Sequence, residues 1–317
     1  MPRLRGAIDL GTNSTQLLVA CEGETGWQVV HEWAAVTRLG EGVERTGRLQ
    51  PAATERTLAT VAGFLAAARE RFPGLAGTAG GTSALRDATN RDEFLAACQS
   101  RCGFVPAIFS GREEAETTFL GVASGVPDGT PLIDLDVGGG STEVAAGWPG
   151  RCMVAESLDL GCVRFGERFG LLGVSDTSSR AAARQAARAL LAPALANTQS
   201  CLSGEIQVRI SGGTATTLAA AVLGLTAYDR DRVEGWETTP DQIGEWAERL
   251  GGMALAERSA LPCVNEGRAL VLPAGLLILH EALHCLGIDR VRVTTRGLRA
   301  GMLVRLSQGT LAECWRV

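Results

Sequence analysis

Three short apolar runs, separated by glycine and polar residues, occupy the start of the sequence. Their length and spacing predict three neighbouring strands, at residues 4–10, 15–21 and 27–36. After Pro51 the apolar positions recur every three or four residues, which predicts an amphipathic helix that ends near Pro73. Further elements are expected as a strand at residues 77–83, which leads into a loop that carries Arg86 and Asp87, a helix around residues 94–98 and a strand at 105–109. Ser110 is expected to cap a helix that ends near residue 124.

The same order of patterns starts again after residue 131. The expected elements are strands at residues 132–137, 142–146 and 152–158, a helical stretch at 175–202, a strand at 206–210, helices at 215–223, 240–251, 255–260 and 269–286, a strand at 290–294 and a helix at 298–306. Two three-strand meanders, each followed by helices and strands, predict an α/β chain of two similar halves. Since residues 126–129 form the clearest boundary, we expect domains at 1–127 and 128–317, a hinge between them, and a last helix free to pack back on the first domain.

One turn of three glycines, Gly138, Gly139 and Gly140, joins two of the predicted strands. Its backbone N–H groups are free to approach an anion closely. Asp136 and Glu143 flank the turn and would repel that anion unless a cation lay between them. The combination predicts a site for phosphate and a divalent metal, whereas an ordinary glycine hairpin is the alternative for a single turn of this kind.

A second copy of this turn lies near the N-terminus and strengthens the prediction. Asp, Gly, Ser and Thr stay in register when residues 8–17 are aligned with residues 135–144, at an offset of 136 − 9 = 127 residues. A repeat of that length is a domain rather than a solenoid unit. Asp9 is equivalent to Asp136, so it is either a third metal-side acid or a brace for its own turn. Two such turns from two similar halves would face one another across a cleft.

Composition narrows the chemistry of the phosphate contacts. The 317 residues carry a formal charge of −5, so neither a nucleic-acid nor a membrane partner is expected. All 30 basic residues are arginine, and the lack of lysine excludes a P-loop enzyme of the Walker type. Cationic contacts to phosphate must therefore come from arginine. Arg151, Arg164 and Arg168 are candidates for an extended anion groove, with an ordinary solvated face as the alternative.

The nine cysteines are scattered along the chain, and their odd number does not suggest a disulfide framework. They form no Cys-x-x-Cys zinc pattern. No signal-peptide pattern opens the sequence, and we expect no apolar run of transmembrane length. A cytoplasmic location is the default expectation, and the oligomeric state stays open, with a homodimer as one option.

Five motifs carry a family resemblance. In chain order they are Asp9-Leu10-Gly11-Thr12-Asn13-Ser14, Thr82-Ser83-Ala84-Leu85-Arg86-Asp87-Ala88, Ser110-Gly111-x-Glu113-Glu114-Ala115, Asp136-Val137-Gly138-Gly139-Gly140-Ser141-Thr142-Glu143 and Gly212-Gly213-Thr214. Together they resemble the exopolyphosphatase and guanosine pentaphosphate phosphohydrolase (Ppx/GppA) family. The resemblance implies the actin-like fold of sugar kinases, Hsp70 and actin, with two ribonuclease-H-like domains. It also implies a hydrolase, dependent on Mg²⁺ or Mn²⁺, that releases terminal phosphate from inorganic polyphosphate, from guanosine pentaphosphate, or from both.

Carried over by position, the resemblance implies roles for single residues. Glu114 matches the catalytic carboxylate, and Arg86 the arginine that grips phosphate. The metal-side acids match Asp136 and Glu143. The two phosphate loops match Gly11, Thr12, Asn13 and Ser14 in the first half, and Gly138, Gly139, Gly140, Ser141 and Thr142 in the second.

Some of these roles have alternatives. Arg86 could instead form a surface ion pair with Asp87 or Asp92. Gly212, Gly213 and Thr214, at a strand-to-helix junction, either approach a nucleoside or only complete the wall of the cleft. Two departures from the family pattern, Leu270 after Arg268-Ala269 and Glu234-Gly235 in place of a His-Gly pair, concern distal substrate contacts.

Two other classes of function compete with the hydrolase. The segment His280-Glu281-Ala282-Leu283-His284 matches the His-Glu-x-x-His signature of zinc peptidases. Its apolar flanks and the lack of an obvious third ligand favour a packed structural helix, so a zinc peptidase is a remote alternative. The other class is a non-catalytic sensor of phosphate or nucleotide on the same fold, against which the retained Glu114 argues.

Overall fold

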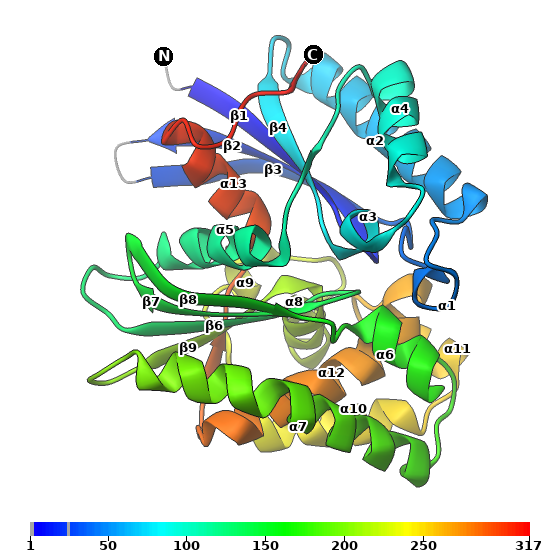
Figure 1. Ribbon diagram of the computed structural model, residues 1–317, viewed down its shortest axis with the longest axis vertical. Helices are drawn as coiled ribbons and strands as arrows, with labels where there is room; N and C mark the ends of the chain where they lie inside the picture. The colour runs from blue at the N-terminus through cyan, green and yellow to red at the C-terminus, as the bar shows by residue number, and fades with distance from the viewer. Residues whose placement is uncertain (1–2, 24–25) are drawn as a thin grey trace.

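The computed structural model describes residues 3–23 and 26–317, and it contains two halves that are each built on a mixed β-sheet (Figure 1). The first half contains β1 (Arg3–Leu10), β2 (Ser14–Gly23), β3 (Gly26–Val36), α1 (Val43–Thr46), α2 (Pro51–Arg71), β4 (Ala76–Gly81), α3 (Ser83–Asp87), α4 (Arg91–Cys102) and β5 (Ala107–Ile108). Helix α5 (Gly111–Ala123) then leads to the second half.

The second half repeats the sequence of a meander followed by helices and strands. It contains β6 (Leu132–Val137), β7 (Thr142–Trp148), β8 (Arg151–Leu158), α6 (Cys162–Phe169), α7 (Thr177–Ser200), β9 (Gln207–Ser211), α8 (Gly212–Val222), α9 (Arg230–Val233), β10 (Glu237–Thr238), α10 (Pro240–Gly251), α11 (Leu255–Ser259), α12 (Glu266–Leu286) and β11 (Val291–Val293). The chain ends with α13 (Leu298–Ser307) and β12 (Trp315–Arg316).

Five strands of each sheet have the same order and the same directions, whereas the sixth strands differ, because β12 pairs with β4 and β10 pairs with β11. In the first, β1, β2 and β3 form an antiparallel meander, β4 pairs parallel with β1, and β5 pairs parallel with β4. In the second, β6, β7 and β8 form the meander, β9 pairs parallel with β6, and β11 pairs parallel with β9. This repeated order is the ribonuclease-H-like arrangement, so the predicted fold class is confirmed.

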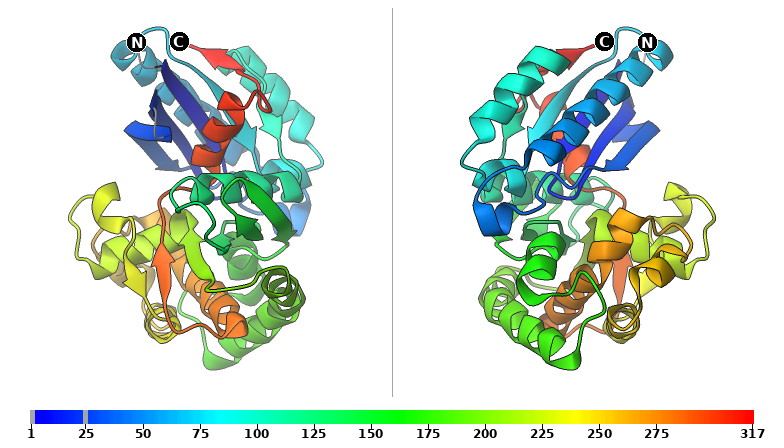
Figure 2. Two further views of the ribbon diagram at one scale, coloured as in Figure 1. Left: turned by 90° about the vertical axis from the view of Figure 1, so that its left-hand side faces the viewer. Right: turned by 90° about the vertical axis from the view of Figure 1, so that its right-hand side faces the viewer.

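Helices α5 and α13 lie between the two sheets and pack against one another (Figure 1). Phe119 and Val122 of α5 pack on the second sheet, whereas Leu298 and Met302 of α13 pack on the first. Strand β12 pairs antiparallel with β4, so the chain returns to the sheet in which it began, and both ends lie at one pole of the molecule (Figure 2). The division at residue 127 stays a prediction.

Most of the predicted elements agree with the structure, but three expectations were wrong. Arg86 lies in the short helix α3 and not in a loop, and Gly212 begins helix α8 instead of preceding it. The third concerns α12, which is long and apolar enough to cross a membrane. It is nevertheless mostly buried, and it packs against α6, α7 and α10, so α12 is the core helix of the second half.

Candidate active site

The two glycine turns have the same geometry. The Gly11 N–H donates to the Ser14 carbonyl oxygen over 3.1 Å, and the Gly138 N–H donates to the Ser141 carbonyl oxygen over 3.0 Å. Each turn joins the central strand of a sheet to its antiparallel neighbour. Because the turns end equivalent strands of the two sheets, they bring the same backbone N–H groups to the cleft from opposite sides.

The turns also touch one another, as the repeat predicts. A Cβ atom added at Gly139 would lie 2.8 Å from the Thr12 Cβ and 3.0 Å from the Asn13 backbone nitrogen. Side-chain carbon atoms do not approach one another that closely in close-packed proteins. Glycine at position 139 is therefore required by the close approach of the two halves.

Between the turns lies a cavity of about 90 Å³. Its walls contain Glu114 and every predicted phosphate-loop and metal-side residue except Thr142. The predicted site residues that line the cavity are Asp9, Gly11, Thr12, Asn13, Ser14, Glu114, Asp136, Gly138, Gly139, Gly140, Ser141, Glu143, Gly212, Gly213 and Thr214. Thr142 is fully buried instead, and its hydroxyl donates to the Leu160 carbonyl oxygen. Arg86 lies outside the lining of this cavity.

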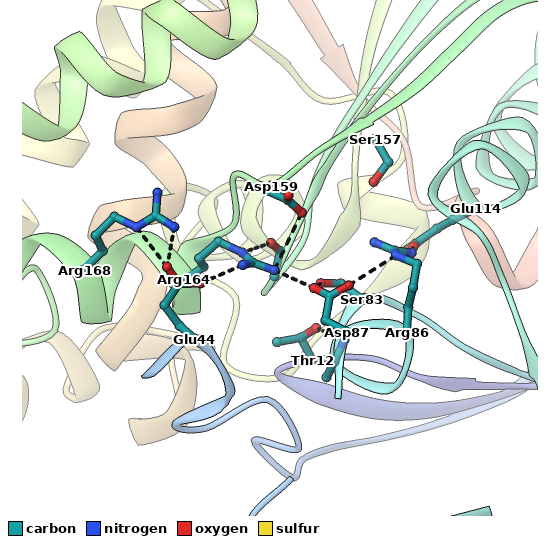
Figure 3. Close-up of polar contacts among 12 residues, drawn as sticks. Thr12, Glu44, Ser83, Arg86, Asp87, Glu114, Ser157, Asp159, Arg164 and Arg168 are labelled. Atoms are coloured by element: carbon teal, nitrogen blue, oxygen red, sulfur yellow. Dashed lines mark hydrogen bonds and ion pairs between the residues drawn. The ribbon is translucent and has the colours of Figure 1, made fainter. Parts of the chain in front are cut away.

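Glu114 reaches the cavity from the first turns of α5. Ser110 caps this helix through a capping box: its hydroxyl accepts from the Glu113 N–H, and the Glu113 carboxylate accepts from the Ser110 N–H. This fixes the start of the helix, so that Glu114, four residues after the cap, points into the cleft while remaining 7% exposed. One carboxylate oxygen, Oε2, accepts from Arg86 Nη1 over 2.7 Å (Figure 3).

Burial sets the protonation of Glu114. It raises the pKa of the Glu114 carboxyl to about 7, although the Arg86 guanidinium acts to lower that pKa. Asp9 and Asp136 raise it further because their negative charges disfavour a third one nearby. A carboxyl with a pKa near neutrality exists in both forms at physiological pH, which suits a group that accepts a proton.

Three more acids in the cavity have raised pKa values. Burial raises the pKa of Asp9 to about 7 against the lowering effect of Arg299, and it raises that of Asp136 to about 6 against Ser211 and Arg268. The pKa of Glu143 is also raised, by burial and by the neighbouring Glu114 and Asp136 carboxylates. The cavity thus gathers four acids, and an anionic ligand would be repelled unless a cation accompanied it.

The donor set fits a hard divalent cation such as Mg²⁺. Asp9 Oδ1 is buried and has no hydrogen-bond partner among the described residues, so it is available as a ligand. Across residues 3–23 and 26–317, no group of three or more His, Cys, Asp or Glu side chains is arranged to hold a metal ion. Mg²⁺ rarely uses such a group, since it is usually held by one or two carboxylates together with waters and substrate phosphates.

The structure adds residues that the sequence patterns did not single out for the site. Gln16 lines the cavity and is the repeat equivalent of Glu143, since 16 + 127 = 143, so the alignment contained the signal for it. Thr118 lies one helical turn after Glu114 and lines the cavity too. Arg268 was noted only for its departure from the family pattern, yet it lines the cavity, and its Nη2 donates to Ser14 Oγ over 3.3 Å.

A larger cavity of about 440 Å³ adjoins the first one. The two share seven lining residues, namely Asp9, Gln16, Asp136, Gly212, Gly213, Arg268 and Leu298. The larger cavity continues toward Tyr228, Asn265 and Arg299. Glu32 of β3 also lines the larger cavity, and it pairs with Arg230 and with Arg299, the latter at 3.1 Å.

The His-Glu-x-x-His segment lies on α12, outside both cavities, and its glutamate is engaged in ion pairs. The Glu281 carboxylate is fully buried, pairs with Arg184 at 2.9 Å, and pairs also with Arg188. Hydrogen bonds from His280, Arg184 and Arg188 lower its pKa to about 2 against the effect of burial. A glutamate held in this way is not available as the general base of a zinc peptidase.

The site lies between two similar halves. It combines two opposed glycine turns with a buried glutamate that has a pKa of about 7 and a cluster of carboxylates. These features define an α/β enzyme that acts on phosphate compounds. The model of the Ppx/GppA phosphatase family matches residues 18–309, and the chain belongs to that family. The expected family resemblance is therefore confirmed, and the chain is an exopolyphosphatase-like hydrolase.

Individual relatives agree over almost the whole chain. It is similar to Exopolyphosphatase 2 of Mycobacterium tuberculosis, with 33% identity over 323 aligned residues that cover 95% of this chain and 98% of the other. The crystal structure of the Ppx/GppA family member of Aquifex aeolicus is 27% identical, with a TM-score of 0.78 and coverage of 98% and 99%. An exopolyphosphatase from Cytophaga hutchinsonii shares the fold, with a TM-score of 0.86, 22% identity and coverage of 97% and 98%.

Proposed function

We propose that the protein is an exopolyphosphatase that hydrolyses the terminal phosphoanhydride of inorganic polyphosphate with Mg²⁺ or Mn²⁺ as cofactor. The observation that carries the proposal is the opposition of the two phosphate turns beside Glu114, in a cavity that also holds Asp9, Asp136 and Glu143. Similarity to a relative named as an exopolyphosphatase supports the choice of substrate.

In this proposal the two turns bind the terminal phosphoryl group. Their backbone N–H groups donate to its oxygens from both sides of the cleft. The Asn13 side-chain amide is buried on the cavity wall and has no hydrogen-bond partner among the described residues, so it can donate to a phosphate oxygen without breaking another bond. Arg268 supplies the positive charge next to the first turn.

Glu114 is the proposed general base. Its raised pKa allows it to accept a proton from the attacking water at neutral pH, and the Arg86 hydrogen bond fixes the direction of its carboxylate. The resemblance implies that Arg86 would also contact the transferred group with its remaining N–H groups, although its side chain lies outside the lining of the cavity in this structure. One or two of the carboxylates of Asp9, Asp136 and Glu143 would hold the divalent cation together with waters and phosphate oxygens. When bound, the cation shares the negative charge of the phosphoryl oxygens.

A nucleoside polyphosphate such as guanosine pentaphosphate is the second candidate substrate. The adjoining cavity of about 440 Å³ favours it, because pockets of about 300 to 1,000 Å³ suit small organic ligands. Gly212 and Gly213 line both cavities, so a chain of phosphates in the first could continue into the second. With polyphosphate, the same space would hold the next phosphates of the chain beside Arg268 and Arg299.

Phosphate release from short polyphosphate, long polyphosphate and guanosine pentaphosphate, measured side by side with Mg²⁺, tests the proposal. We expect release from both polyphosphates, and a kcat/KM for guanosine pentaphosphate above that for polyphosphate would select the nucleotide instead. Binding of these ligands by calorimetry without any turnover over hours would favour the sensor. Stoichiometric zinc in the purified protein would revive the peptidase alternative.

The setting of the enzyme completes the proposal. We place the reaction in the cytoplasm, where polyphosphate is the partner and no nucleic acid or membrane is involved. A homodimer is compatible with this function, and light scattering of the purified protein measures it. The two domains, residues 1–127 and 128–317, would close around the substrate at the hinge at 126–129.

A further inference from the structure

A chain of charged contacts crosses the cleft beside the phosphate turns (Figure 3). Arg164 belongs to α6 in the second half, and its side chain is only 15% exposed. Its Nη1 donates to Glu44 Oε2 and its Nη2 to Asp87 Oδ2, both over 2.6 Å, and both acids belong to the first half. Its Nε donates to the Gly140 carbonyl oxygen over 2.7 Å, so the same side chain also fixes the second phosphate turn.

Asp87 lies between two arginines. Arg164 Nη2 is 2.6 Å from Asp87 Oδ2, whereas the Nε atom of Arg86 is 3.6 Å from Asp87 Oδ1. The Nη1 atom of Arg86 donates at the same time to Glu114 over the shorter distance of 2.7 Å, and the Ser83 hydroxyl donates to Asp87 Oδ2 over 3.1 Å. The closer partner of Asp87 is therefore the arginine from the opposite half.

The two pairings of Asp87 depend differently on the cleft. Arg86 and Asp87 are consecutive residues of α3, so they can pair whether the halves are together or apart. Arg164 reaches Asp87 only when the halves are together, because the two residues come from opposite sides of the cleft. Without Arg164, the negative charge of Asp87 would attract Arg86 and compete with Glu114 for it.

We infer that Arg164 is a positioning residue that makes the Arg86–Glu114 pair depend on closure of the cleft, by binding Asp87 and so leaving Arg86 to Glu114. The inference rests on the proposed function, in which Glu114 is the general base. It assigns to Asp87 the role of a competitor that holds Arg86 away from Glu114 while the cleft is open. Hydrolysis is then confined to the closed state, in which both phosphate turns contact the substrate.

The same face of α6 provides a matched control. Arg168 lies one helical turn after Arg164 and pairs with the same acid, Glu44. Its only ion pair among the described residues is with Glu44, and it forms none with Asp87. Arg168 lines neither of the two cavities of the site. Replacing Arg168 thus weakens the contact between the halves and leaves the competition for Arg86 untouched.

Steady-state phosphate release from polyphosphate with Mg²⁺ tests the inference in Arg164→Gln, Arg164→Gln with Asp87→Asn, and Arg168→Gln. We expect Arg164→Gln to lower kcat about 10- to 100-fold, the usual effect of losing a charged hydrogen bond, with a smaller change in KM. Adding Asp87→Asn removes the competitor and should restore kcat to within about threefold of wild type. Arg168→Gln should keep kcat within about twofold of wild type.

The rescue by Asp87→Asn decides the result. A double variant as slow as Arg164→Gln would overturn the inference, since a purely structural role of Arg164 is not repaired by removing a second partner. An Arg164→Gln variant with wild-type kcat would overturn it as well. Thermal unfolding shows whether Arg164→Gln folds. If it does not, Arg164→Lys keeps a cation near Asp87 and should retain more than about a third of kcat. Loss of activity in a folded Arg164→Lys variant would count against the inference. Failure of the proposed function is distinct, because wild type itself would then release no phosphate.

Discussion

Raising the pH from 5 to 8 should destabilise the metal-free protein, because the change ionises carboxyls that are buried together in the active-site cavity. Asp9 and Glu114 have pKa values of about 7, and Asp136 of about 6. In the unfolded chain their ordinary values are 3.8 for Asp and 4.5 for Glu. Between pH 4 and 7 the folded state therefore binds more protons than the unfolded state, and the free energy of unfolding falls as pH rises.

The magnitude follows from the size of the shifts. One pKa unit corresponds to about 1.4 kcal/mol, so the shift of Asp9 from 3.8 to about 7 represents about 4 kcal/mol and that of Asp136 about 3 kcal/mol. Because each ionised carboxylate makes the next ionisation harder, the separate contributions do not simply add, and the free energy of unfolding falls by several kcal/mol in total. This loss is absent below about pH 4 and complete once the pH exceeds about 7. Paired acids such as Glu281, with a pKa of about 2, are already ionised in this range and leave the trend unchanged.

Thermal unfolding in EDTA at pH 5, 6, 7 and 8 measures the effect. We expect Tm to fall by about 5 to 15 °C over this range, since 1 kcal/mol changes Tm by about 2 to 4 °C in a protein of this size class. Mg²⁺ should recover more of the loss at pH 8 than at pH 5, because it binds the ionised acids.

Variants separate the buried acids from the rest of the protein. Asp136→Asn should raise Tm at pH 8 and flatten the dependence on pH. Asp128→Asn, at an exposed position, is the control and should behave as wild type. A Tm in EDTA that is as high at pH 8 as at pH 5, or higher, would contradict the raised pKa values of these buried acids.

Three further predictions concern single positions. Gly139→Ala places a methyl group against Thr12 and should cost about 1 to 3 kcal/mol of stability and about 10- to 100-fold in kcat/KM. The control Gly63→Ala, inside helix α2 with open space around it, should leave kcat/KM at the wild-type value and stabilise the protein by up to about 1 kcal/mol. Calorimetry and phosphate release measure both variants. Arg86→Gln removes the group that lowers the pKa of Glu114, so the acidic limb of the kcat–pH profile should move to higher pH, and an unchanged limb would contradict the pairing. Arg258 is fully buried and donates to four backbone carbonyls. Arg258→Met should therefore lower the free energy of unfolding in denaturant titrations by about 2 to 5 kcal/mol, while kcat stays within about twofold of wild type. A stability equal to wild type would contradict this role.

The fold was largely predictable because its strands and long helices have local periodicity. The two meanders and the helices α2, α5 and α10 were predicted close to their observed bounds. Helix α3, with five residues, is too short to show a helical period, so Arg86 was placed in a loop. The membrane-length character of α12 was missed because Gly275 and Pro273 interrupt its apolar run, although they do not interrupt the helix.

The site was predictable where it repeats and unpredictable where it depends on distant contacts. The offset of 127 residues identified both turns, and it contained Gln16 as well. Arg268 contacts Ser14 across 254 positions, and Arg164 contacts Glu44 across 120, and neither pair has a local pattern that reveals it. Contacts of this kind are set by how the two halves meet, and only the structure gives them.

Hydrolysis of long-chain polyphosphate by wild type and Glu114→Gln, with orthophosphate assayed and the remaining chains resolved by gel, tests directly whether Glu114 is the general base for release of terminal phosphate. We expect Mg²⁺-dependent release of orthophosphate, with the remaining chains shortened from their ends, and a kcat lower by about 10²- to 10⁴-fold in Glu114→Gln, the usual range for loss of a general base. Undiminished release by Glu114→Gln, or no release by wild type, would contradict it.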